Sequence, residues 1–253
     1  MSHPETLFVG KTILWLEETQ SSNSFMADQL KVSDMSDGWV VVASHQTEGK
    51  GTSGNKWEDE KGKNLLFSVL LKPGFIPARN QFLLNQIICL AIADAIESMF
   101  DLKVMLKWPN DIFIHEKKIG GVLIENVLMG NSIKQSIIGI GINVNQKQFD
   151  NKIMQAESLT NLVNAEIDIT KILLTILKRI EVYYLTCQAG KILEIGSNYK
   201  NRLLGINEKR KYKIGDMIVD GIIKGLSDEG QLQIEIKNEL IQFGFKEIEF
   251  LID

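Results

Sequence analysis

The sequence predicts an α+β fold: a mixed, largely antiparallel sheet flanked by helices and followed by a small β-barrel. Over residues 1–204, apolar strands joined by short turns alternate with helical patterns, and short turns favour antiparallel neighbours. After Leu204 the chain changes to short strands separated by tight turns, which is the pattern of a small barrel. We therefore expect two domains, residues 1–204 and residues 205–253.

The expected elements follow from apolar periodicity and from the turn residues between them. Ser21 or Ser22 can cap a helix that begins there. The Gly-rich, polar segment 46–63 predicts a mobile loop, and the charged segment 115–118 predicts a turn. Strands are expected at residues 13–16, 39–44, 65–71, 104–108, 112–114, 119–127, 136–144, 211–214, 218–223, 232–236 and 241–245, and long helices at residues 81–100 and 170–188.

Composition and charge exclude several classes of protein. The net charge is −4, whereas proteins that act by binding nucleic acid are usually basic, so neither DNA nor RNA is an expected partner. The apolar stretch 82–100 is interrupted by polar and acidic residues, which indicates a core helix and not a membrane span. Residues 1–10 contain no apolar run of signal-peptide length. A soluble, cytoplasmic protein is the expectation.

Cysteine and histidine give no sign of a metal or redox centre. Cys89 and Cys187 lie in apolar helical patterns, where buried thiols are expected and neither a disulfide nor a catalytic thiol. The three histidines, His3, His45 and His115, are isolated from one another. A dedicated transition-metal site is therefore not expected.

Four segments have residue patterns that suggest chemistry. The first, 49–57, combines glycines with two lysines. Backbone N–H groups at glycines can approach an anion closely, although a Gly/Lys stretch alone is more often a surface loop, and this one lacks the spacing of a P-loop.

The second, 107–111, places a proline before Asn110 and Asp111 and so presents both at one bend. It fits either an Asx-type turn or a group that orients an amine or a metal–phosphate.

The other two segments place glycines inside apolar strands. Gly120 and Gly121 follow Lys118, and a glycine pair in a strand usually marks the close approach of a ligand or another backbone. The segment 139–145 repeats the pattern and ends in polar residues. An apolar slot with a cation at its rim is the expected result.

In order and spacing, these four segments resemble the motifs of the biotin–protein ligase family. The matching stretches are Gly-Lys-Gly-Thr-Ser-Gly-Asn-Lys-Trp, Lys-Trp-Pro-Asn-Asp, Lys-Ile-Gly-Gly-Val-Leu-Ile-Glu and Gly-Ile-Gly-Ile-Asn-Val-Asn. Upstream, Ser21-Ser22-Asn23 and Gln46 also match, and the segment ending at 245–248 resembles the family's SH3-like domain. The resemblance spans nearly the whole chain. It implies a catalytic fold like that of class II synthetases.

The resemblance implies a reaction and a role for each matching residue. The family activates biotin with ATP and Mg²⁺ as biotinyl-AMP, then transfers biotin to a lysine of a biotin carboxyl carrier domain. By resemblance, the catalytic residues are Lys118, Asp111, Lys107 and Lys50. Biotin is assigned to Ser21, Ser22, Asn23, Gln46, Gly49, Lys50, Gly51, Trp57, Lys118, Gly120 and Gly121, and the nucleotide to Lys50, Thr52, Trp57, Asn110 and Asn143.

The chain departs from the family pattern in the glycine loop. The family commonly has arginines where Lys50 and Thr52 stand. Lysine keeps the charge but loses the two-pronged geometry of a guanidinium, and threonine loses the charge. We hypothesise that the adenylate is held less tightly here than in relatives that have both arginines.

Several alternatives remain open. A lipoate ligase or an octanoyl transferase would share the catalytic fold, but the sequence shows neither an arginine-rich segment followed by glycines nor a cysteine at a turn. A non-catalytic biotin sensor, or a C-terminal barrel that acts as a separate adaptor, would belong to other classes. Only eighteen residues precede Thr19, so the ligase-only form is expected, without the DNA-binding domain of some members. The acceptor carboxylase and a possible homodimer stay undecided.

Overall fold

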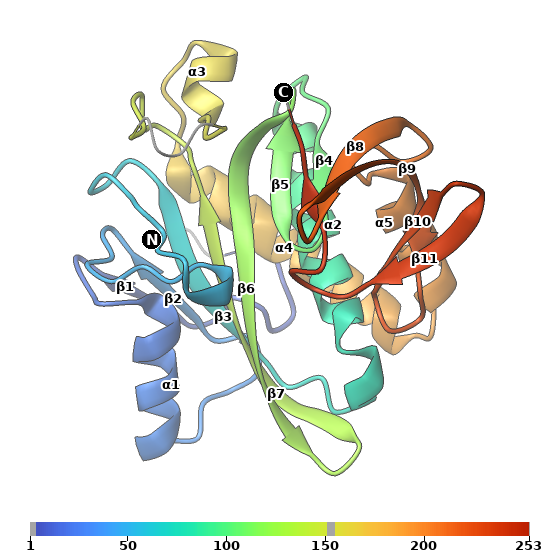
Figure 1. Ribbon diagram of the computed structural model, residues 1–253. Coiled ribbons are helices and arrows are strands. Elements are labelled where there is room, and N and C mark those ends of the chain that lie inside the picture. The colour runs from blue at the N-terminus through green and yellow to red at the C-terminus, as the bar shows by residue number, and fades with distance from the viewer. Residues whose placement is uncertain (1–3, 151–154, 253) are drawn as a thin grey trace.

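The computed structural model describes residues 4–150 and 155–252, and its largest element is a seven-stranded mixed sheet (Figure 1). His3 lies outside the described residues. The two strands at one edge, β1 and β2, run parallel, and every other neighbouring pair is antiparallel. In spatial order the strands are β1 (Ile13–Leu16), β2 (Val40–Ala43), β3 (Leu65–Leu71), β7 (Ser132–Ile142), β6 (Lys117–Met129), β5 (Asp111–Ile114) and β4 (Met105–Lys107).

One face of this sheet is covered by long helices that form the main core. In β2 and β3 alternate residues, such as Val40, Phe67 and Val69, point toward that core because side chains in a strand alternate between faces. α2 (Phe82–Met99) packs on this face beside α4 (Ile169–Gln188), and α5 (Ile192–Asn201) packs against α2.

The most apolar stretch of the chain lies in α2, and its burial shows whether it is a core helix or a membrane span. Among the described residues, one helical stretch, Ala78–Met99, is long and apolar enough to cross a membrane by length and composition. However, 72% of its apolar window is buried inside the protein, so it is a core helix, as predicted. Cys89 in α2 and Cys187 in α4 are both buried and free, as expected.

The opposite face of the sheet is covered only in part. α1 (Ser22–Val32) packs on it through Met26, which joins Val41, Leu70 and Ile137 in a second, smaller core cluster. α1 contacts β2, β3 and β7, and its residue Asn23 lies against Gly139 of β7. A pocket forms on that part of the face.

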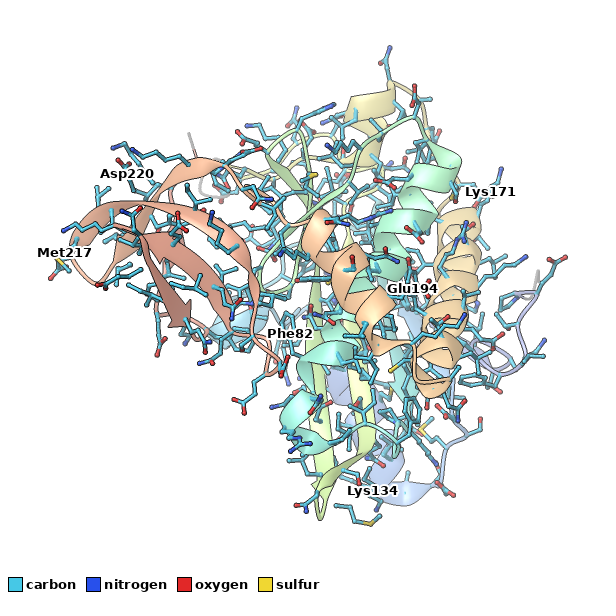
Figure 2. All side chains as sticks on the ribbon, turned by 90° about the vertical axis from the view of Figure 1, so that its right-hand side faces the viewer. Phe82, Lys134, Lys171, Glu194, Met217 and Asp220 are labelled. Carbon is cyan, nitrogen blue, oxygen red and sulfur yellow. The ribbon has the colours of Figure 1, made fainter. Side chains whose placement is uncertain are left out.

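The C-terminal part forms a five-stranded antiparallel sheet, which is consistent with an SH3-like domain. It docks on the first part: Trp108 Nε1 donates to the Gly230 carbonyl at 2.9 Å, and Phe245 packs against Trp108 and Phe82. Figure 2 shows Phe82 at the junction of the two parts. In spatial order the strands are β11 (Glu239–Phe243), β10 (Leu232–Ile236), β9 (Met217–Leu226), β8 (Lys209–Ile214) and β12 (Glu249–Phe250).

Several boundaries differ from those the sequence predicts. The four-residue turn 115–118 is wrong: only His115 and Glu116 turn, both at positive φ, and Lys117 and Lys118 already pair with β5. The expected strand 241–245 ends at Phe243. Several short elements were not predicted: α3 (Leu159–Val163), α5, β12 and the 3₁₀ turns η1 (Thr52–Gly54) and η2 (Ala78–Asn80).

Candidate active site

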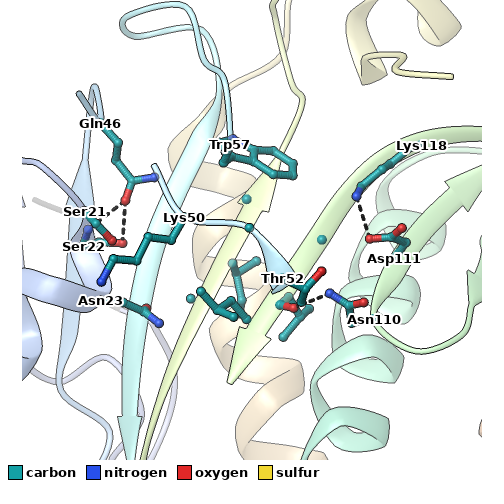
Figure 3. A pocket seen from close by; sticks show the side chains of 17 residues that line it. Ser21, Ser22, Asn23, Gln46, Lys50, Thr52, Trp57, Asn110, Asp111 and Lys118 are labelled. Carbon is teal, nitrogen blue, oxygen red and sulfur yellow. Dashed lines mark hydrogen bonds and ion pairs between the residues drawn. The ribbon is translucent and has the colours of Figure 1, made fainter. Parts of the chain in front are cut away.

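The pocket lies on the open part of the large sheet, with glycines as its floor (Figure 3). A side chain at Gly141 would meet the Trp57 ring at 2.7 Å, and one at Gly139 would meet the Asn23 amide at 2.6 Å. Glycine in β7 therefore lets these neighbours lie directly on the sheet. Twelve of the residues that the sequence assigns to the site line this pocket: Ser21, Ser22, Asn23, Gln46, Lys50, Gly51, Thr52, Trp57, Asn110, Asp111, Lys118 and Gly121.

One end of the pocket is lined by the hydrogen-bonding groups of Ser22, Asn23 and Gln46, of which the first two are buried. Gln46 Oε1 accepts the Ser22 backbone N–H at 2.7 Å. Asn23 Nδ2 donates to Glu125 Oε2 at 2.7 Å. Ser68 Oγ lies 2.6 Å from Asn23 Oδ1 and 2.7 Å from Ser22 Oγ. This end suits an uncharged ligand group that carries both donors and acceptors.

The N-terminus of α1 is capped differently from the sequence-based expectation. Ser21 stands at the cap position, but its side chain makes no capping hydrogen bond. Instead Gln46 reaches across from the end of β2 and accepts the first free N–H of the helix, that of Ser22. The Gln46 side chain thus caps the start of α1 and also forms part of the pocket wall.

The other end of the pocket carries a charged pair. Lys118 Nζ on β6 lies 2.7 Å from Asp111 Oδ1 on β5, with 32% and 18% of the two side chains exposed. The ammonium group also lies 5.9 Å from the centre of the Trp57 ring. Beside this pair, Asn110 Nδ2 donates to the Val122 carbonyl at 2.6 Å. Figure 3 shows this charged pair at one end of the pocket and Ser21, Ser22, Asn23 and Gln46 at the other, with Lys50 reaching toward the second end.

The segment between these two ends forms a short hairpin above the sheet. Lys50 pairs with Lys56 across it, and Trp57 N–H donates to the Gly49 carbonyl at 2.9 Å. Trp57 Nε1 is buried and has no hydrogen-bond partner in the described part of the chain. As it stands the pocket encloses about 50 Å³, whereas ligand pockets usually hold about 300 Å³ or more. A ligand of that size requires the hairpin to move.

A wider groove of about 850 Å³ opens beside the pocket, toward the C-terminal sheet. Both are lined by Thr52, Asn110 and Asp111. Lys107 lies in this groove, 5.5 Å from the Phe113 ring centre and 5.4 Å from that of Phe250. Burial between these rings lowers the pKa of Lys107, although Asp111 opposes the shift.

Three further residues assigned by sequence lie outside the pocket lining. A side chain at Gly120 would meet Ile142 and the Gly141 carbonyl, so this glycine serves sheet packing and not the pocket floor. Gly49 faces the Trp57 carbonyl. Asn143 is buried, and its amide donates to the Glu157 carbonyl at 3.0 Å. Direct ligand contact by these residues stays a prediction, as do the roles of the lining residues.

Two residues at the neutral end were not predicted from the sequence. Ser68 is the one polar residue in the apolar strand β3, and it is fully buried. Glu125 ends the apolar run of β6. The isolated serine was a usable signal, because a buried hydroxyl needs a partner. Glu125 is the last residue of the matching stretch 118–125, but that stretch assigned it no role, because its contact with Asn23 depends on the register of the sheet.

The described residues offer no ready-made metal centre. Across 4–150 and 155–252, no group of three or more His, Cys, Asp or Glu side chains is placed to hold an ion. Asn110 and Asp111 do lie together on the pocket wall, and both carry the oxygen donors that Mg²⁺ prefers. Because Mg²⁺ commonly binds one or two protein oxygens together with substrate phosphates, this pair fits an ion that arrives with a nucleotide.

Comparisons with known proteins agree with this geometry. Residues 15–143 match the model of the biotin/lipoate A/B protein ligase family. The bifunctional ligase/repressor BirA of Bacillus spizizenii is 28% identical over 97% of this chain and 76% of its own length. The biotin–[acetyl-CoA-carboxylase] ligase of Mycobacterium tuberculosis is 25% identical over 87% of this chain and 81% of its own.

A solved structure extends the similarity to three dimensions. The biotin protein ligase from Aquifex aeolicus in complex with biotin and ATP matches with a TM-score of 0.80 and 30% identity, over 96% of this chain and 100% of that one. The family match covers half of the chain and most of the elements that form the pocket. This chain belongs to the biotin/lipoate A/B protein ligase family.

Proposed function

We propose that this protein is a biotin–protein ligase, which joins biotin to AMP with ATP and then transfers biotin to a lysine of an acceptor protein. The observation that carries the proposal is the joining of two different ends in one pocket: buried amides and hydroxyls at one, and Lys118 with Asp111 at the other. The relatives and the solved structure, which are named for this activity, support it.

Biotin has a neutral cyclic urea at one end and a carboxylate at the other. The urea matches the end formed by Ser22, Asn23 and Gln46, because it carries both N–H donors and a carbonyl acceptor. The carboxylate then lies toward Lys118. Lipoate, the other substrate class in the family's description, has a dithiolane ring without such donors. It would leave the buried polar groups of this end unpaired, which favours biotin.

In the first step a biotin carboxylate oxygen attacks the α-phosphorus of ATP. The bond from this phosphorus to the oxygen that bridges it to the β-phosphate breaks, and pyrophosphate leaves. Two anions meet, so the site must supply positive charge. Lys118 stands at this end of the pocket, Lys50 lies in its wall, and Lys107 lies in the adjoining groove. Mg²⁺ held beside Asn110 and Asp111 would supply further counter-charge.

In the second step the acceptor amine attacks the carbonyl carbon of biotinyl-AMP, AMP leaves, and the amine loses a proton. Asp111 lies on the wall shared by the pocket and the groove, where an amine that enters through the groove would arrive. Its Oδ1 already pairs with Lys118, so its second oxygen is the one that can orient the amine. We assign Asp111 this positioning role.

The acceptor is proposed to be a biotin carboxyl carrier domain, in keeping with the carboxylase ligase among the relatives. The groove is wide enough for a protruding turn that carries a lysine, and Glu229 and Glu249 in its lining would attract a cationic side chain. We propose a cytoplasmic location for this reaction, which needs a supply of ATP.

The transfer is tested with purified protein, biotin, ATP, Mg²⁺ and a biotin carboxyl carrier domain, read out by intact mass. The carrier should gain one biotinyl group, and a carrier whose acceptor lysine is replaced by arginine should gain none. Lys118→Ala should slow the gain by about 100-fold or more, whereas Lys117→Ala, at the exposed neighbouring lysine, should not. Equal rates for these two variants would count against the proposal.

A further inference from the structure

A chain of polar side chains runs from the exposed Glu125 into the neutral end of the pocket. Asn23 Nδ2 donates to Glu125 Oε2, and Asn23 Oδ1 lies 2.6 Å from Ser68 Oγ. Ser68 Oγ lies in turn 2.7 Å from Ser22 Oγ, which lines the pocket. Asn23, Ser68 and Ser22 are all buried, so water does not compete for the contacts among these three side chains.

The direction of each hydrogen bond in this chain follows from Glu125. A carboxylate only accepts, so the Asn23 amide must turn its nitrogen toward Glu125 and its oxygen toward Ser68. A hydroxyl has one proton, and Ser68 must donate it to the Asn23 oxygen. The short contact between Ser68 and Ser22 therefore uses the proton of Ser22.

The remaining contacts agree with this direction. Gln46 Oε1 already accepts the Ser22 backbone N–H at 2.7 Å, and its separation from Ser22 Oγ is 3.1 Å. Hydroxyl donors normally lie about 2.5–3.0 Å from an oxygen acceptor, so the shorter contact to Ser68 is the one that holds the proton. Ser22 Oγ then keeps lone pairs for a ligand, while the Gln46 nitrogen and the second Asn23 N–H are donors.

We infer that Glu125 is a specificity-determining positioning residue, which makes Ser22 an acceptor for an N–H of the bound cyclic urea. This inference rests on the proposed function. Without an acceptor at position 125, the Asn23 amide can turn over. Ser68 then donates to Ser22, and Ser22 presents a proton where the urea also presents one. The specificity for a urea would be lost although no residue in contact with the ligand had changed.

The test uses two ligands that differ at this position: biotin, and a carbamate analogue in which oxygen replaces one ureido N–H. Both possible analogues are made, and their Kd values are measured by calorimetry without ATP. The wild-type protein should prefer biotin over one analogue by about tenfold or more. Glu125→Lys, which places a donor beside Asn23, should remove most of this preference, and Glu125→Ala should reduce it severalfold. Position 125 is exposed on its strand, so both variants should fold.

The control is Glu166→Lys, which makes the same change of charge at an exposed position elsewhere. It should keep the preference of the wild-type protein. A purely structural role for Glu125 would weaken both ligands alike and leave their ratio unchanged. An unchanged ratio in either folded Glu125 variant overturns the inference. Failure of the wild-type protein to bind biotin would instead overturn the proposed function, and the inference with it.

Discussion

At the scale of single residues, two lysines of the site differ in how much free energy the burial of their charge costs. Lys118 pairs with a carboxylate and stays partly exposed, whereas Lys107 lies between two rings and is paired less directly. The lowered pKa of Lys107 shows that the folded protein disfavours its charged form, mainly through burial. Such a cost is retained at a position where function uses the charge.

Replacing Lys107 by methionine should therefore increase stability while it removes activity. The folded pKa lies below the unfolded one, so between them the unfolded chain binds more protons, and stability rises with pH across that window. Lys107→Met should be more stable than wild type at neutral pH and should lack the alkaline rise. Urea unfolding at neutral and alkaline pH measures both effects, and Lys117→Met, at an exposed position on β6, is the control. A less stable Lys107→Met protein would show that the ring contacts outweigh the burial cost.

Thr52 tests the departure from the family pattern. It lines both the pocket and the groove, where an arginine would reach the adenylate phosphate. Thr52→Arg should slow the release of biotinyl-AMP by about tenfold or more, because hydrogen bonds to charged groups stabilise by about 1.5–3 kcal/mol. The release rate of labelled adenylate measures this, and Thr52→Gln, which is long but neutral, should release it as wild type does. Equal release by Thr52→Arg and wild type would end this hypothesis.

Most site residues could be predicted because their motifs are local. Lys118, Asp111 and Gln46 were recognised from short stretches, and the structure brings them to one pocket. Contacts between residues of different motifs could not be predicted in this way. Glu125 and Asn23 are far apart in sequence and meet only through the pairing of β6 with β7 and the packing of α1.

At the scale of elements, the predictions held best where apolar residues are frequent. β3 and β10 have the predicted bounds, and α2 differs by one residue at each end. α3 is too short to show a period, and α5 has glycine and few apolar residues in its middle. Such elements gain their order from the surfaces against which they pack.

Gly139 in β7 tests how closely α1 and the sheet must fit. A Cβ there would lie 2.6 Å from Asn23 Oδ1, and Asn23 cannot yield easily because Glu125 and Ser68 hold its amide. Gly139→Ala should weaken biotin binding by about tenfold or more and destabilise the fold by about 1–3 kcal/mol. Calorimetry and urea unfolding measure the two effects.

The control for that substitution is Gly196→Ala in α5, where no atom lies within 4 Å of the added carbon. Alanine there should stabilise the protein by about 0.5–1 kcal/mol and leave biotin binding unchanged. If Gly139→Ala binds biotin as tightly as Gly196→Ala does, Asn23 does not contribute to binding from its present position.

At the scale of the whole molecule, the two sheets share one site. The C-terminal sheet contributes Phe250, which packs near Lys107, and Gly230, whose carbonyl accepts the Trp108 indole N–H. Trp108 and Lys107 belong to the same short segment before β5. Docking of the small sheet therefore shapes the groove beside the pocket. The division into domains at residue 204 stays a prediction.

Gly230 tests this docking. Its φ is +87°, and an added Cβ would overlap the Phe82 ring, so Gly230→Ala should destabilise the protein by about 3 kcal/mol or more. Gly215→Ala, also at positive φ but in open space, should cost only about 1–2 kcal/mol. Transfer of biotin to the carrier should fall more than biotin binding does in Gly230→Ala. Equal losses of stability in the two variants would mean that the contact with Phe82 is not important for docking.

The central claim is that one pocket binds the biotin urea at its neutral end and activates the carboxylate at its Lys118 end. The most direct test is ATP–pyrophosphate exchange with Mg²⁺ and no acceptor protein, run beside lipoate and octanoate. We expect exchange with biotin alone, and its loss in Lys118→Ala but not in Lys117→Ala. Exchange with lipoate or octanoate but not with biotin, or no exchange in a protein that still binds biotin, would contradict the claim.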